Sequence, residues 1–191
     1  MKWIAISIVF SLSCFAQHLS EPYSVKGDRL GENLATWKAN NPRFDSCDGN
    51  AGDRIADPDV VYCVPRSWED GQSLSFAGSP LLAETTWFYK GSLYKIEMTL
   101  LSTAGLANIM TGLKTTLGTP NHRQTKTLRN GFGFKFDRHR WTWTNKVSTA
   151  ELVYSNTGDD CPRITFTLDG PNKTATASHK IAELNGAPSG T

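Results

Sequence analysis

The segment from residue 84 to residue 118 constrains the fold most, because it combines a β-hairpin pattern with an amphipathic helix. Two runs rich in β-branched and aromatic residues, 85–89 and 93–100, flank Lys90-Gly91, a dipeptide typical of a two-residue hairpin turn. Alternation places Glu84 and Glu97 together on the polar face. The apolar face is then made of Trp87, Tyr94, Ile96, Met98 and Leu100. A half-buried hairpin of this kind needs an element that covers its apolar face.

The covering element is predicted immediately after the hairpin. Ser102 or Thr103 is expected to cap the start of a helix, Gly118 to end it, and Pro120 to prevent its continuation. The apolar residues of this segment recur at helical spacing, at Leu106, Ile109, Met110, Leu113 and Leu117. This pattern predicts an amphipathic helix packed on the hairpin.

Further elements are predicted on both sides of this unit. Leu30, Leu34 and Trp37 lie on one helical face, which predicts a first helix with Asn33 as its N-cap and a stop at Pro42. Residues 60–64 read as a short strand, and residues 122–168 as a second sheet segment. In that segment, alternating phenylalanines at 132, 134 and 136 precede an expected turn at 137–140. The tryptophans at 141 and 143 then follow, so the two aromatic rows are expected to stack across two strands.

These elements predict the α+β class, with an antiparallel β-sheet and two α-helices packed on one face. The order of a helix followed by strands occurs twice, in residues 30–100 and 104–168, which is the pattern of two tandem repeats. We expect residues 17–170 to form a single domain. Residues 171–191 are polar and rich in small side chains, which predicts a disordered tail.

Residues 1–16 have the pattern of a secretory signal peptide. Lys2 precedes an apolar run that is too short to span a bilayer, and Cys14-Phe15-Ala16 fits a small-x-small cleavage site. We therefore expect a secreted or periplasmic protein without a transmembrane segment in the mature chain. A lipid anchor on Cys14 is the less favoured alternative, because Ser11 stands where a lipoprotein signal has leucine or a similar residue.

In a secreted protein, the cysteines are expected to form disulfide bonds. In an oxidising compartment, Cys47 and Cys63 are predicted to form a disulfide bond that ties down the loop between them. Cys161 is then left over, and the sequence is compatible with a free thiol, exchange with the pair, or pairing between chains.

The motifs favour a non-catalytic role. The chain has no Gly-x-Ser-x-Gly, no phosphate-binding glycine loop and no Cys/His signature of a thiol hydrolase. The histidines are not at metal-ligand spacing, and the acid-rich residues 45–59 do not fit the EF-hand pattern for calcium. We therefore assign no catalytic residue, no metal and no cofactor, and we expect no nucleic-acid partner.

Charge is the feature that points to a partner. The formal net charge is +2, but residues 114–146 contain eight bases and only one acid. This segment predicts either a solvated hairpin face or a patch that attracts an acidic protein surface, a polysaccharide or lipid head groups. The candidate patch residues are Arg129, Lys135, Arg138 and Arg140. Trp68, which lies in a polar loop, is the candidate exposed aromatic residue.

Several short motifs resemble those of a group of uncharacterised secreted bacterial proteins. They are Leu30-Gly31-Glu32-Asn33-Leu34, the Cys47 and Cys63 pair, Phe76-Ala77-Gly78, residues 91–96 and Leu117-Gly118-Thr119-Pro120. Gly31 and the Gly118-Thr119-Pro120 stop also resemble the ends of the helix-plus-sheet unit of the BamE lipoprotein and of β-lactamase inhibitor proteins. Glu32 replaces the usual methionine, and Asn41-Pro42 lacks the closing glycine. This resemblance implies a module that works by protein contact.

We therefore expect a secreted or periplasmic protein-interaction module of unknown partner, either a protein or an anionic component of the envelope. The alternative is a carbohydrate-binding or glycan-processing envelope protein that uses exposed tryptophans, since aromatic rows on a sheet face bind sugars.

Overall fold

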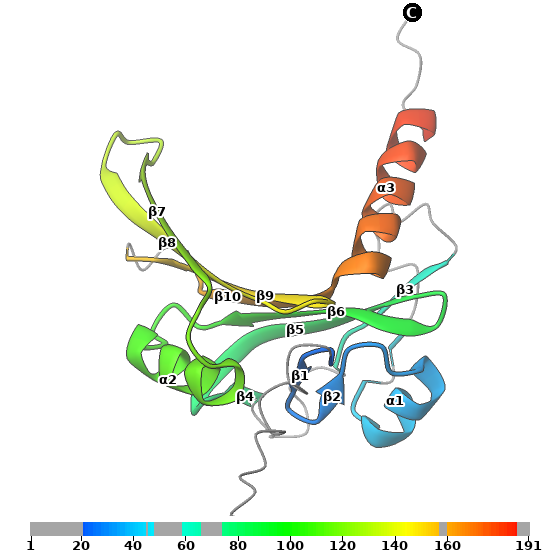
Figure 1. The fold of residues 1–191 in the computed structure, drawn as a ribbon. Helices are drawn as coiled ribbons and strands as arrows, with labels where there is room; N and C mark the ends of the chain where they lie inside the picture. Colours follow the sequence, from blue (N-terminus) through cyan, green and yellow to red (C-terminus); the bar gives the residue numbers. More distant parts are fainter. Residues whose placement is uncertain (1–20, 45, 48–58, 66–73, 157–159, 187–191) are drawn as a thin grey trace, which may run out of the picture.

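The computed structural model describes residues 21–44, 46–47, 59–65, 74–156 and 160–186. Within these ranges the chain forms a mixed α+β fold with an eight-stranded sheet, a separate two-stranded hairpin and three helices (Figure 1). The main sheet contains β3 (Val60–Cys63), β4 (Ser75–Phe76), β5 (Ser79–Tyr89), β6 (Ser92–Leu100), β7 (His122–Arg129), β8 (Lys135–Thr144), β9 (Ser148–Ser155) and β10 (Arg163–Leu168). The small hairpin contains β1 (Ser24–Val25) and β2 (Asp28–Arg29), and the helices are α1 (Leu34–Asn40), α2 (Leu106–Leu117) and α3 (Asp169–Gly186).

The strands of the main sheet follow the order β3-β5-β6-β10-β9-β8-β7, with β4 added to β5, and every pair is antiparallel. β10 lies between β6 and β9, so the last strand joins the β5–β6 hairpin to the β7–β8–β9 meander. The predicted α+β class and antiparallel sheet are confirmed. The tandem repeat stays a prediction, and the predicted set of two helices leaves out α3.

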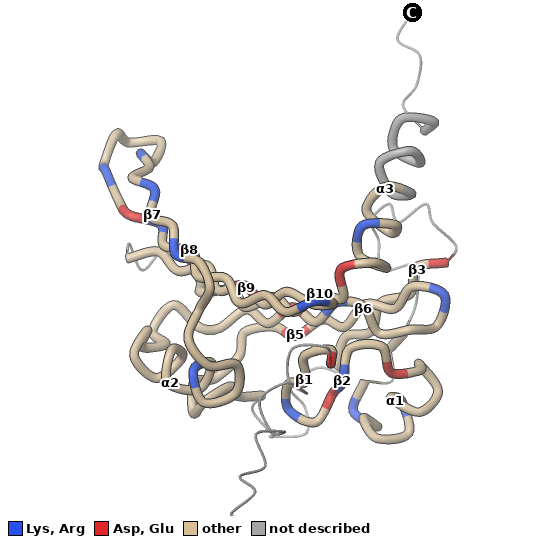
Figure 2. The backbone as a smooth tube through the Cα atoms, viewed as in Figure 1, with Lys and Arg blue, Asp and Glu red and all other residues tan. Residues whose placement is uncertain are grey.

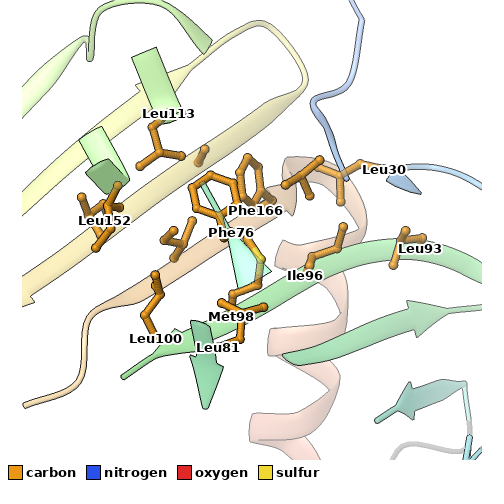
Figure 3. Close-up of a cluster of buried hydrophobic side chains, with 14 of the residues drawn as sticks. Leu30, Phe76, Leu81, Leu93, Ile96, Met98, Leu100, Leu113, Leu152 and Phe166 are labelled. Carbon is orange, nitrogen blue, oxygen red and sulfur yellow. The ribbon is translucent and has the colours of Figure 1, made fainter. Parts of the chain in front are cut away.

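One face of the sheet packs against the main hydrophobic core. α1, α2 and the β1–β2 hairpin lie on this side of the sheet (Figure 1). Trp37 of α1 and Leu113 of α2 are fully buried in the same cluster as Ile96, Leu152 and Phe166 from three different strands. Figure 3 shows side chains from both halves of the sheet converging in this cluster. Because each buried side chain of this size contributes about 1.5–3 kcal/mol, the shared core holds the two halves together.

Local signals set most helix ends. Asn33 is the N-cap of α1, as predicted, and its Oδ1 accepts a hydrogen bond from the Ala35 N–H at 2.9 Å. Gly118 ends α2 with a φ of 80°, a conformation that glycine adopts without steric cost. The predicted cap of α2 is wrong, because Gly105 occupies the N-cap position in place of residue 102 or 103. The Ala104 N–H bonds to the carbonyl of residue 101 at 2.9 Å, and this extra turn delays the helix.

The β5–β6 hairpin has the predicted turn. Lys90 and Gly91 have φ values of 50° and 75°, and positive φ at both central residues is the mark of a type I′ turn. The strand register is interrupted next to the turn, because Trp87 lies opposite Lys95 while Phe88 lies opposite residue 93. One residue of β6 is therefore extra at this point, and such a bulge shifts the alternation of side chains by one.

Because of this bulge, the predicted assignment of hairpin side chains to the two faces of the sheet is wrong. Trp87 and Tyr94 pack in a second cluster on the other side of the sheet, away from the core that contains Met98. The same bulge puts Glu84 opposite Met98 on the core face, where it is 2% exposed. Glu97 lies one position away in the register and faces the opposite side. The expected grouping of Glu84 with Glu97 on one polar face is therefore wrong.

The residues from 171 to 186 correct the predicted tail, because they continue helix α3. α3 lies on the side of the sheet opposite α1 and α2 (Figure 1). Ala175 of α3 is 4% exposed and packs in one cluster with Val60 and Tyr94, with Leu168 partly buried against them. The sequence of this helix is polar and only weakly periodic, so its contact with the sheet stabilises it where amphipathicity does not.

Cys47 and Cys63 form the predicted disulfide bond, which joins β3 to the segment that follows α1. Cys161 is free and half-buried. Residues 1–16 and Trp68 lie outside the described residues, so the signal peptide and the exposed tryptophan stay predictions.

Candidate functional site

The β7–β8 hairpin extends beyond its neighbours in the sheet. β8 pairs with β7 from Lys135 onward, but it pairs with β9 only from Arg138 onward. Residues 127–137 therefore have no other described strand beside them, and the hairpin rises on the same side of the sheet as α3 (Figure 1). Asn156 supports the base of this projection, because its Oδ1 accepts a hydrogen bond from the Asp137 N–H at 3.2 Å.

The tip of the hairpin is a turn organised by Asn130. Asn130 Oδ1 accepts hydrogen bonds from the N–H groups of Phe132 at 3.1 Å and Phe134 at 3.0 Å. Gly133 has a φ of 85°, which favours glycine at this position. The turn directs both aromatic side chains into solvent, so that Phe132 is 90% exposed and Phe134 is 71% exposed. The remaining large apolar side chain exposed among the described residues is Leu82, at 45%.

This turn lies at a different position from the predicted one. Residues 137–140 form part of β8, whereas the phenylalanines at 132 and 134 lie in the turn and do not stack on the tryptophans of β8. Phe136 is the one phenylalanine of the three that lies in a strand, opposite Leu128. Asn130-Gly131 and Gly133 are the local turn signals, and the alternating phenylalanines obscured them in the sequence.

Two pairs of like charges lie across the hairpin. In the β7–β8 register, Arg129 lies opposite Lys135, and Lys126 lies opposite Arg138. Since side chains alternate along a strand, the two pairs point to opposite faces of the hairpin. Like charges directly opposite each other destabilise an antiparallel pair. The fold alone therefore does not favour this arrangement of cations.

The four predicted patch residues all lie on this hairpin, where Figure 2 shows a series of Lys and Arg positions. They differ in what surrounds them. Arg129 and Lys135 lie beside the tip, and neither has an ion-pair partner in the described part of the chain. Arg138 and Arg140 lie nearer the sheet and form ion pairs, with Asp160 at 2.9 Å and with Glu151 at 3.4 Å. Arg129 and Lys135 are thus the cations most open to a partner.

Lys126 belongs to the same surface, although the sequence did not single it out. Its side chain is exposed and has no ion-pair partner among the residues described. Asp137 is the one acid in the hairpin, and it accepts a hydrogen bond from Thr127 Oγ1 at 2.7 Å. Its charge is therefore held by a hydroxyl donor on the neighbouring strand and does not pair with the cations at the tip.

The described tryptophans do not form an exposed row. Trp37, Trp141 and Trp143 are 0%, 6% and 1% exposed. Trp87 is half-buried on the face partly covered by α3, with its ring centroid 5.1 Å from that of Tyr62 and 5.1 Å from the Lys95 Nζ. Trp87 is therefore the most exposed of the tryptophans that the structure describes.

Two carboxyl groups are buried where the β1–β2 hairpin meets β5. Asp28 is 6% exposed and Glu84 is 2% exposed. Lys26 Nζ donates a hydrogen bond to Glu84 at 2.7 Å, and Asn41 Nδ2 donates one to Asp28 at 2.9 Å. Burial raises the pKa of Asp28 and the nearby Glu84 raises it further, whereas the hydrogen bond from Asn41 lowers it.

A pocket of about 460 Å³ lies beside the same β1–β2 hairpin. Its lining residues are Pro22, Gly27, Arg29, Leu30, Gly31 and Glu32. Neither of the buried carboxyl groups, Asp28 and Glu84, is among them. The Lys26–Glu84 pair therefore ties the β1–β2 hairpin to β5, and the Asn41–Asp28 bond ties it to the end of α1, while neither acid lines the pocket.

No group of three or more His, Cys, Asp or Glu side chains is placed to hold a metal ion, as far as the described residues extend. Among the helices of the same residues, none is both long enough and apolar enough to cross a membrane. Comparisons of the chain with models of protein families, with curated proteins and with solved structures found no match. Function must therefore be argued from geometry, and the β7–β8 hairpin is the surface where unpaired cations and exposed aromatic side chains coincide.

Proposed function

We propose that this chain is a secreted or periplasmic, non-catalytic interaction module whose basic β7–β8 hairpin binds an anionic partner. The observation that supports this function is the pair of Arg129 and Lys135, which face each other at the projecting tip and have no ion-pair partner among the described residues. Their repulsion destabilises the free hairpin. An anionic partner relieves this repulsion on binding, so the arrangement favours the complex.

Two other features agree with this location and role. Disulfide bonds such as that between Cys47 and Cys63 persist in oxidising compartments, and the predicted signal peptide would send the chain to a compartment of this kind. The resemblance of the helix ends to BamE and to β-lactamase inhibitor proteins implies a module that acts by contact, without chemistry of its own.

The proposal is tested by crosslinking the tagged mature protein in its own envelope and capturing it at low and moderate salt. Three forms are compared: the wild type, R129E/K135E, and the control K146E/K173E, which changes the net charge equally at exposed sites outside the hairpin. We expect the wild type and the control to retain the same partner and the hairpin variant to lose it. Capture should weaken as salt rises, because exposed charges are screened over about 10 Å at 0.1 M salt. Equal capture by all three forms would refute the proposal.

The second candidate function, binding of an envelope glycan, has Trp87 as its support. This ring lies half-buried on the face of the sheet partly covered by α3, beside Tyr62 and Lys95. A panel of cell-wall glycans should quench or shift the tryptophan fluorescence of the wild type but not that of W87F. The absence of a response across the panel would remove this alternative.

A further inference from the structure

The tip of the β7–β8 hairpin has the arrangement of a membrane-surface anchor. We infer that its anionic partner is a lipid surface, into which Phe132 and Phe134 insert while the cations behind them bind the lipid phosphates. This inference rests on the proposed function of the hairpin and names the partner class.

The order of the side chains puts apolar groups outermost. Phe132 and Phe134 are 90% and 71% exposed, the largest exposures among the big apolar side chains that the structure describes. Asn130 holds the turn with two side-chain hydrogen bonds, so the two rings are presented by a defined loop. Behind them, Leu128 and Phe136 lie opposite each other in the strands and are half-buried. Apolar groups exposed in this way mark surfaces that meet a partner or a membrane.

The spacing of the cations matches the layers of a bilayer. Arg129 and Lys135 lie directly behind the turn, and Lys126 and Arg138 lie three residues further back, about 10 Å along the strands. Interfacial segments place their apolar side chains about 5–10 Å into the boundary between head groups and acyl chains. With the phenylalanines at that boundary, the first cation pair lies at the level of the phosphates and the second at their outer edge.

The facing of the cations favours a lipid surface over an acidic protein. The pair of Arg129 and Lys135 points to one face of the hairpin. Lys126 points to the other face, beside Arg138, whose charge is paired with Asp160. A patch on a protein partner meets one face of a hairpin. A plane of head groups penetrated by the tip surrounds it, so cations on both faces contact phosphate at the same time.

The size of each contribution follows from general transfer and surface-potential values. Each Lys or Arg near an anionic bilayer raises affinity about fivefold. Burial of one phenylalanine ring raises it about tenfold. We therefore expect R129E/K135E to lower vesicle affinity by at least about 25-fold, and F132S/F134S to lower it by about 100-fold.

The experiment measures flotation of the mature protein with vesicles of phosphatidylcholine alone and of phosphatidylcholine with about one third phosphatidylglycerol, a composition that supplies the anionic surface. Matched controls are K146E/K173E for the charge variant and L82S for the phenylalanine variant, since Leu82 is exposed but lies far from the hairpin in sequence. Soluble glycerol phosphate at the same head-group concentration tests whether a free phosphate replaces the surface. F134W with brominated acyl chains reports depth, as quenching in excess of that of the wild type.

We expect binding to anionic vesicles by the wild type and both controls, its loss in both hairpin variants, quenching of F134W and no competition by glycerol phosphate. Wild-type binding by F132S/F134S would overturn insertion, and complete competition would overturn a lipid surface. Absence of vesicle binding, together with an envelope partner that is lost in R129E/K135E, would overturn the lipid inference and leave the proposed function standing, with a protein or polysaccharide as the partner. If R129E/K135E matches the wild type in both vesicle binding and envelope capture, both ideas fail.

Discussion

Replacing Arg129 or Lys135 by glutamate should change the stability of the hairpin and its binding in different ways. The two residues lie directly opposite each other in the β7–β8 register. A single replacement turns a pair of like charges into a pair of opposite charges, whereas the double replacement restores a pair of like charges of the other sign. Stability depends on the product of the two charges, and binding to an anion depends on their sum.

The magnitude follows from the cross-strand geometry. Directly opposite Cβ atoms in an antiparallel pair lie about 4.5–5.5 Å apart. Two unit charges about 5 Å apart in water interact by about 0.8 kcal/mol, and screening at 0.1 M salt reduces this to about 0.5 kcal/mol. Changing repulsion into attraction therefore stabilises the hairpin by about 1 kcal/mol. The double variant should lose this gain, and because Asp137 lies on the same face and repels both glutamates, its hairpin should be no more stable than that of the wild type.

Native-state hydrogen exchange of the backbone amides in residues 127–137 measures this effect, because it reports local opening of the projecting tip. A gain of about 1 kcal/mol slows exchange about fivefold. We expect this slowing in R129E and in K135E, and no slowing in R129E/K135E. Vesicle binding should instead fall at each step from wild type to single to double variant. K146E, which lies outside both strands, should leave these amides unchanged.

The reasoning is refuted if exchange changes in the same direction through the series, so that the double variant differs from the wild type by twice as much as the singles. It is also refuted if single variants exchange at the wild-type rate at both low and moderate salt. In either case the two side chains do not interact as the register requires.

Three further predictions concern stability. A Cβ on Gly112 would overlap the Cβ of Ala77, so G112A should destabilise the protein by about 1–2 kcal/mol in urea unfolding despite its better helix propensity, and the loss should vanish in an A77G background; an equal effect in both backgrounds contradicts this. Because burial raises the pKa of Asp28, the folded chain binds that proton more tightly than the unfolded chain, and the contribution of this group to stability falls as pH rises through the folded pKa. D28N should therefore stabilise the protein relative to wild type more at about pH 7 than at about pH 4, and a constant difference would be evidence against this account. Replacing both Cys47 and Cys63 by serine should lower the free energy of unfolding by about 3 kcal/mol, and an unchanged denaturation midpoint would show that the bond does not constrain the unfolded chain.

Part of the candidate site was accessible from the sequence. The excess of bases in residues 114–146 predicted a cationic surface, and the four patch residues do lie on one hairpin. Which of these residues lie opposite each other could not be predicted from the sequence, because the register depends on the position of the turn. With the turn at residues 130–134, Arg129 lies opposite Lys135 and the phenylalanines become exposed. With the predicted turn at 137–140, neither would follow.

The sequence by itself determined the elements that depend on neighbours a few residues apart. The Asn33 cap, the Lys90-Gly91 turn and the end of α2 at Gly118 are satisfied within their own segment, and the spacing of the apolar residues of α2 is likewise set within that segment. A hydrogen bond or a backbone conformation of this kind needs no contact with distant parts of the chain.

The tertiary structure decided which faces meet. The bulge beside Trp87 exists because β5 and β6 differ by one residue between the turn and the core contacts, and it moves that ring to the opposite face. The place of β10 between β6 and β9, and the docking of Ala175 of α3 on the second face, join residues far apart in the sequence. Such contacts depend on the packing of whole layers, which local periodicity does not encode, because a shift of one residue reverses every side chain of a strand.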